Sequence, residues 1–219
     1  MRTVLGTALL FVAGPTAVVG QEMSAAARVQ DADRLLQAGR YAEARTVYAE
    51  AARASAGNAR VRASAVFGQA LASQQGAALD SVASAPIDSL LAAYRTARTL
   101  DSARLYGPAS NNAGLVLRGR GRHREALRYF RDAAGTTHPA RPYFYLNAGR
   151  EYEILGQPDS ASRMYRRALQ VDNGYTEARQ ALLALYARRP SSDALLALAR
   201  RGGPEPAASA AVNDAILEV

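Results

Sequence analysis

Small and apolar residues recur along the chain at spacings of three and four, which places them on one face of a helix. The clearest case follows three glycines, each of which is followed by Ala five residues later, an aromatic residue nine later and Ala twelve later. The sets are Gly39 with Ala44, Tyr48 and Ala51; Gly121 with Ala126, Phe130 and Ala133; and Gly156 with Ala161, Tyr165 and Ala168. The pattern predicts pairs of antiparallel helices that turn at these glycines, with the alanines allowing close approach and the aromatic ring filling the gap.

A second set of small residues stands seven positions before each glycine, at Ala32, Gly114 and Gly149. The tripeptide Asn-Ala-Gly also occurs twice, at 112–114 and 147–149, which are 35 residues apart. Repetition at this period indicates an array of stacked units, and such arrays more often bind other molecules than catalyse reactions.

The period divides the chain into four units, at residues 24–56, 57–106, 107–136 and 142–175. The second unit is irregular: with Gly68 as its small residue, the alanine after Tyr94 (Ala97) arrives ten residues late. The surplus lies at 77–86 and is interpreted as a loop or a helix extension. It is either tolerated length drift or a functional loop.

The spacing resembles that of the tetratricopeptide repeat, and the resemblance covers about residues 24–189. It implies an all-α fold, a right-handed superhelical array of antiparallel helix pairs with a C-terminal capping helix. The capping helices are expected at 176–201, because the last unit must cover its apolar face. Residues 202–219 are rich in Gly, Pro and Ala and are expected to form a flexible tail.

In the tetratricopeptide family the first helices of successive units line a concave groove that binds peptides. The resemblance places these residues in the groove: Arg62, Gln69, Asn111, Asn112, Leu115, Arg118, Tyr143, Asn147, Arg150 and Glu153, with Glu177 and Gln180 extending its wall. Asn112 and Asn147 either hold a bound peptide backbone or bond a loop carbonyl within their own repeat. A clamp for C-terminal carboxylates is not expected, because Val29, Ala65 and Pro108 stand where that clamp needs polar or basic residues.

The chain carries a formal net charge of +8, and all 27 of its basic residues are Arg. Arginine usage of this kind reflects either a G+C-rich genome or a preference for anionic partners. A basic ridge is expected on the convex side, formed by Arg95, Arg128, Arg131, Arg163 and Arg166. The ridge either meets an anionic envelope surface or is a solvated face partly neutralised by nearby acids.

The N-terminus predicts export. Arg2 is followed by an apolar stretch from Thr3 to Ala13, and Gly20 ends a small-residue context before Gln21, so residues 1–20 are interpreted as a signal peptide or an uncleaved anchor. The chain contains no Cys, which excludes disulfides and a Cys-linked lipid anchor. The mature chain is therefore expected to be periplasmic or secreted, without a membrane span and without a nucleic-acid partner.

No catalytic motif is present, and neither cofactor nor metal is expected. His123 and His138 are the only histidines, and His123 follows a repeat turn, where it is expected to serve packing. Glu151 and Glu153 lie two residues apart on a helix, so they diverge. The sequence predicts a non-enzymatic scaffold or adaptor that binds another protein or peptide through its concave groove. The alternative is a structural or accessory subunit of an envelope complex, docked through the basic ridge or an uncleaved N-terminal helix.

Overall fold

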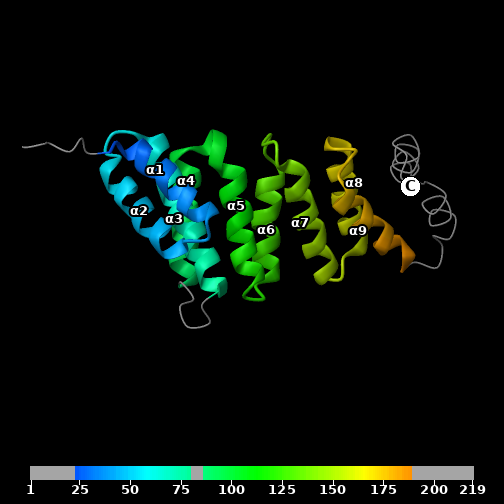
Figure 1. The fold of residues 1–219 in the computed structure, drawn as a ribbon. Coiled ribbons are helices and arrows are strands. Elements are labelled where there is room, and N and C mark those ends of the chain that lie inside the picture. The colour runs from blue at the N-terminus through cyan, green and yellow to red at the C-terminus, as the bar shows by residue number, and fades with distance from the viewer. Residues whose placement is uncertain (1–22, 80–85, 189–219) are drawn as a thin grey trace, which may run out of the picture.

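The computed structural model describes residues 23–79 and 86–188, and these residues form helices joined by short turns (Figure 1). The helices are α1 (Ala25–Gln37), α2 (Tyr41–Ala54), α3 (Ala59–Leu79), α4 (Ile87–Leu100), α5 (Ser102–Arg118), α6 (His123–Ala134), α7 (Arg141–Ile154), α8 (Pro158–Val171) and α9 (Thr176–Ala187). The predicted signal peptide, most of the 77–86 surplus, the end of the capping region and the C-terminal tail lie outside the described residues.

The helices stand side by side in chain order, which gives the elongated row seen in Figure 1. Each helix packs against the next, and the odd-numbered helices also contact one another from α1 through α9. Helices that touch along a curved array lie on the inside of the curve, so α1, α3, α5, α7 and α9 form an inner layer and the even-numbered helices an outer one. The prediction of an all-α array of antiparallel helix pairs is confirmed.

The turn glycines behave as their spacing predicts. Gly39, Gly121 and Gly156 have φ angles of 73°, 70° and 70°, a left-handed conformation that favours glycine. Each ends the first helix of a pair with a tight hydrogen-bonded turn; in the third unit the amide of Arg122 donates to the Leu117 carbonyl at 3.0 Å. These residues let the chain reverse within three to four positions and so set the helix pairing.

The aromatic residues of the pattern are the largest buried side chains of the array. Tyr48, Tyr94, Phe130 and Tyr165 are at most 1% exposed. Phe130 reaches across to Gly114, where a Cβ would meet the nearest ring carbon at 2.6 Å. The ring of Tyr165 leaves as little room for a Cβ at Gly149. The small residues are therefore required by the aromatic rings opposite them.

The second unit departs from this arrangement. Gly68 accommodates the ring of Tyr48 from the preceding unit rather than that of Tyr94 in its own. Tyr94 instead packs on Phe67, with ring centroids 5.8 Å apart. Helix α3 therefore directs Gly68 toward α2, where the regular spacing predicts that it faces the aromatic residue of its own unit.

The start of the third unit differs from the sequence prediction. Helix α5 begins at Ser102, ahead of the expected unit start at Gly107, and passes through Pro108. Gly107 lies where α5 crosses Thr136 and Phe144, so it marks a close contact and not a helix start. At the far end, α9 covers the fourth unit with Leu182 among its buried residues. Within the described residues no helix has the length and apolarity to cross a membrane.

Candidate functional site

A buried carboxylate lies at the centre of the inner layer. Glu151 of α7 is fully buried, and it accepts a hydrogen bond from Arg118 Nε of α5 at 2.6 Å. Its second carboxylate oxygen lies 2.6 Å from Nδ1 of His123, at the start of α6. A buried carboxylate is costly unless it is paired and hydrogen-bonded, and Glu151 has both forms of compensation. The three side chains therefore tie the third unit to the fourth.

Two of the predicted groove asparagines belong to this network. Asn147, 1% exposed, donates to the side chain of Asn111 at 2.9 Å, and its own side-chain and backbone oxygens accept from Arg118 at 3.2 and 2.9 Å. Asn111 is 3% exposed. Both partners of Asn147 lie on α5, so these hydrogen bonds run to the preceding repeat and not to a loop carbonyl of its own. The structure brings Asn111, Arg118 and Asn147 together, but as an internal junction between repeats.

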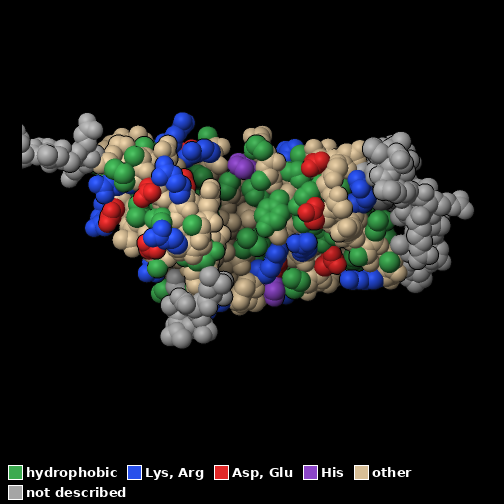
Figure 2. All heavy atoms as spheres, viewed as in Figure 1, with side chains coloured by type: hydrophobic (Ala, Val, Ile, Leu, Met, Phe, Trp, Pro, Cys, Tyr) green, Lys and Arg blue, Asp and Glu red, His purple; other side chains and the backbone are tan. Residues whose placement is uncertain are grey.

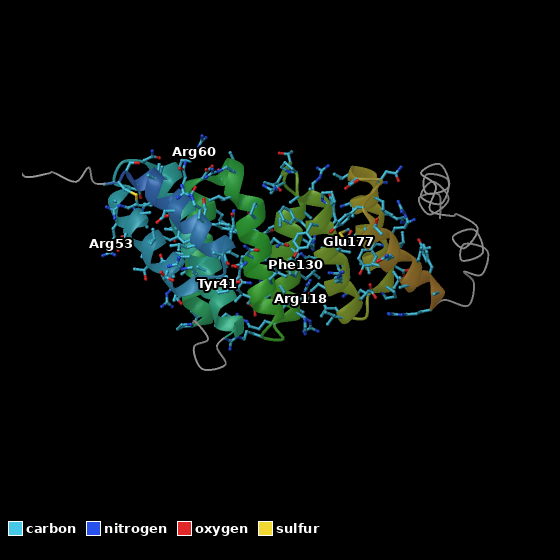
Figure 3. All side chains as sticks on the ribbon, viewed as in Figure 1. Tyr41, Arg53, Arg60, Arg118, Phe130 and Glu177 are labelled. Atoms are coloured by element: carbon cyan, nitrogen blue, oxygen red, sulfur yellow. The ribbon has the colours of Figure 1, made fainter. Side chains whose placement is uncertain are left out.

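Arg118 also contacts the buried aromatic residue of its own repeat. It stacks over the ring of Phe130, with its guanidinium carbon 4.5 Å from the ring centroid, and Figure 3 shows the two side by side. In the next unit the matching pair is Glu153 and Tyr165, joined by a hydrogen bond from the tyrosine hydroxyl. A phenylalanine has no hydroxyl for a carboxylate, so an arginine takes that place and is free to reach α7. Glu151 and Glu153 diverge, as predicted.

Asn112 is the remaining predicted groove asparagine, and its side chain acts on the buried Tyr94. Tyr94 donates its hydroxyl hydrogen to Gln74 at 2.6 Å. Burial is the main cause that raises the pKa of Tyr94, and a hydrogen bond from Asn112 opposes this rise. Asn112 is partly buried, so it too is largely engaged with its neighbours.

The exposed groove residues gather between α7 and α9. Tyr143 is 39% exposed, and Arg150 is exposed about two turns further along the same helix. Burial is the largest cause that raises the pKa of Tyr175; Glu177 and Tyr143 raise it further and Arg150 lowers it, so these groups lie within electrostatic range of the Tyr175 hydroxyl. We call Tyr143, Arg150, Tyr175 and Glu177 the inner patch. Figure 2 shows basic, acidic and hydrophobic side chains mixed on this part of the face, and Glu177 is labelled there in Figure 3.

Tyr175 was not among the predicted groove residues. It precedes α9 in the turn after α8, and its position beside Tyr143 depends on how tightly that turn folds. The remaining predicted residues lie elsewhere on the inner helices: Leu115 is half-buried on α5, Glu153 bonds Tyr165 and Arg188, and Gln180 is exposed on α9.

Arg62 and Gln69 do not join this group. They line a hollow together with Ala49 and Ala52 of α2. The structure thus groups Arg62 and Gln69 with side chains of α2 and not with the exposed residues of α7 and α9.

The predicted basic ridge lies on three outer helices. Arg95, Arg128, Arg131 and Arg163 are exposed and Arg166 is half-buried. None of them forms an ion pair with an acid of the described residues. Across the same described ranges, no group of three or more acidic or histidine side chains could hold a metal ion.

Comparison with known proteins identifies the repeat. Residues 142–175 match the family model described as tetratricopeptide repeat. The chain is similar to the solved structure of pilF from Pseudomonas aeruginosa, at 20% identity and TM-score 0.64, covering 89% of this chain and 83% of that one. It is also similar to MamA from Desulfovibrio magneticus, at 16% identity and TM-score 0.59, covering 89% and 94%. A putative kinesin light chain with TPR-like repeats from Podosopora anserina shows 14% identity and TM-score 0.59, covering 82% and 96%. No curated protein sequence matches.

These similarities show the fold, a tetratricopeptide-like α-solenoid. The identities are too low for any property of those proteins to pass to this chain with the fold.

Proposed function

We propose that this solenoid is a non-enzymatic scaffold that binds a segment of another protein on its inner face. The observation that carries the proposal is the inner patch, where the exposed side chains of Tyr143, Arg150 and Glu177 lie within electrostatic range of the partly buried Tyr175. Tyrosine and arginine dominate the energetics of protein interfaces, because each offers a large contact area together with hydrogen-bond donors.

The network behind the patch supports the same proposal. Arg118, Glu151 and Asn147 hold α5 against α7, so the helix that carries Tyr143 and Arg150 is fixed before a partner arrives. A preorganised surface loses less conformational entropy on binding. The predicted groove asparagines thus contribute by positioning the patch.

We also propose that the chain is exported and acts in the periplasm or outside the cell. The support is Arg2, the apolar stretch from Thr3 to Ala13 and the small-residue context that ends at Gly20. The pilF and MamA structures, from bacteria, share the fold, and their own locations carry no weight in this proposal.

The test is co-purification of the tagged full-length chain from its native source, with and without Tyr143→Ala and Arg150→Glu together. Both residues are exposed, so the fold is expected to survive the change. The matched control is Arg163→Glu, an equally exposed arginine on the outer helix α8. Loss of a specific partner in the double variant alone supports the proposal; loss in the control alone contradicts it.

A second candidate function is docking to an anionic envelope surface through the basic ridge. The observation that favours it is the row of exposed arginines at 95, 128, 131 and 163 without acidic partners among the described residues. Attraction of this kind is screened by salt. Sedimentation with phosphatidylglycerol vesicles at about 0.05 and about 0.5 M salt tests it. Salt-sensitive binding that Arg131→Glu with Arg163→Glu abolishes would favour this candidate.

A further inference from the structure

The outer surface of the array has furrows between successive outer helices, and each is floored by an inner helix. The furrow between α4 and α6 is filled by the protein itself. Arg98 of α4 stacks over Tyr106 of α5 and Tyr129 of α6, with its guanidinium carbon 4.9 and 5.7 Å from the ring centroids. The same guanidinium bonds Ser110 at 3.2 Å and lies 3.7 Å from the Asp132 carboxylate.

The space between α6 and α7 is also filled. Phe144 of α7 is 2% exposed and packs against Ala133 and Ala134 of α6, with Tyr145 beside them. Aromatic side chains of the chain itself therefore occupy both places.

The furrow beside α2 is open. A hollow of about 450 Å³ lies between α2 and α3. Its floor consists of small apolar side chains, Ala49, Ala52, Ala56 and Val66. At its rim stand Arg53 and Arg62, both exposed, and neither pairs with a carboxylate of the described residues.

Alignment of the buried aromatic residues explains why this furrow is empty. Counted from Tyr48, Tyr94 and Phe130, Ala52 of α2 stands where α4 has Arg98. In the same count Ala93 and Thr96 of α4 stand where α6 has Tyr129 and Asp132. The open furrow therefore lacks the aromatic ring and the carboxylate that close the next one, yet it keeps arginines at its rim.

We infer that the hollow between α2 and α3 is a second binding site, for an acidic helical segment of a partner protein that supplies one aromatic residue and a carboxylate three positions later. The aromatic ring fills the apolar floor, and the carboxylate pairs with Arg53 or Arg62. The pair Tyr129 and Asp132 in the next furrow has the same spacing and meets an arginine in the same way. Charge complementarity supports the same occupant, because the rim is positive and has no internal counter-charge.

This site is separate from the inner patch, so the two can be tested independently. The probe is a fluorescein-labelled helical peptide with one Phe and one Asp three residues later in a background of Ala, Gln and Glu. Fluorescence anisotropy with the full-length chain measures its affinity. Matched peptides carry Ala in place of Phe or Asn in place of Asp, and the Asn peptide has one added Glu elsewhere to keep its net charge.

Saturable binding of the Phe/Asp peptide is expected, with at least about tenfold weaker binding of each matched peptide. Arg62→Glu and Ala52→Trp, which fills the hollow, are each expected to weaken binding by a similar factor. Arg163→Glu and Tyr143→Ala are expected to leave it unchanged. Absence of saturable binding, or equal binding of all three peptides, overturns the inference, as does competition by phosphatidylglycerol vesicles with no dependence on Phe. Should Ala52→Trp fail to fold, Arg62→Glu at an exposed position still decides the outcome.

Discussion

Arg118 Nε lies 2.6 Å from the carboxylate of Glu151, which is fully buried, and the bond joins the first helices of two adjacent repeats. Arg118 is available for this contact because its own repeat has Phe130 where the next has Tyr165. A single change in the repeat, from tyrosine to phenylalanine, is thereby compensated by a polar junction behind the proposed binding surface.

Removing the arginine tests this junction. Arg118→Ala leaves Glu151 buried with His123 as its remaining partner, and is expected to lower the free energy of unfolding by about 3 kcal/mol. Urea denaturation followed by circular dichroism measures the change. Arg150→Ala, an exposed arginine on α7, is the control and is expected to cost less than about 0.5 kcal/mol. Equal effects of the two variants would contradict the importance of the junction.

Replacement of glycine by alanine is expected to change the stability in opposite directions at Gly114, which lies against Phe130, and at Gly119, which does not. Gly114→Ala places a methyl group against the buried ring and is expected to destabilise by about 1–3 kcal/mol, although alanine is the better helix former. Gly119 has a φ of −61°, and a Cβ there would meet its nearest neighbours at 3.6 Å. Gly119→Ala is therefore expected to be neutral or stabilising by up to about 1 kcal/mol.

Chemical denaturation of both variants measures the difference. Adding Phe130→Leu to Gly114→Ala replaces the ring with a smaller side chain. The double variant should recover part of the lost stability, because it opens the space that the methyl group needs. A Gly114→Ala protein as stable as the unchanged chain would show that the ring moves away without cost.

The buried tyrosines predict loss of stability at alkaline pH. Burial is the largest cause that raises the pKa of Tyr94 and of Tyr165 above the ordinary value of about 10, and the hydrogen bond to Glu153 raises the pKa of Tyr165 further. Below about pH 10 both hydroxyls are neutral in the folded and unfolded states, so their contribution is fully present. As the pH rises further, the unfolded state ionises first and stability falls.

Urea denaturation at a series of pH values from about 8 to 11.5 tests this, with tyrosinate absorbance followed in parallel. The stability of Tyr94→Phe is expected to fall less steeply above about pH 10 than that of the unchanged chain. Identical pH profiles would contradict a raised pKa at this position.

Export makes a simple prediction. The protein recovered from outside the cytoplasm is expected to begin at Gln21, because residues 1–20 are removed as a signal peptide. N-terminal sequencing or intact mass measures this directly. A recovered chain that begins at Met1 would contradict cleavage and favour an uncleaved anchor.

The fold was predictable from the sequence because it depends on local spacing. The turns at Gly39, Gly121 and Gly156 need a residue in the left-handed conformation, and the alanines and aromatic rings share one helix face. Both requirements produce residues that recur at fixed spacing in the sequence. The orientation of α3 was not predictable. It depends on which of Tyr48 and Tyr94 occupies the space at Gly68, and this is a contact between units that spacing does not encode.

The candidate site was predictable only in part. Tyr143 and Arg150 are exposed on α7, and their place in a binding groove stays a prediction. The burial of Glu151 and Asn147 could not be read from the sequence, because it follows from the reach of Arg118 across the repeat boundary. A charged residue is ordinarily expected at the surface, and only its partners in space show otherwise.

The most direct test of the central proposal is site-specific photo-crosslinking in native envelope material. A photoreactive amino acid replaces Tyr143 in the inner patch, and in a matched variant it replaces Arg163 on the outer helix α8. The proposal predicts a discrete crosslinked partner from position 143 that position 163 does not give. A partner captured from position 163 and not from 143 would contradict inner-face binding.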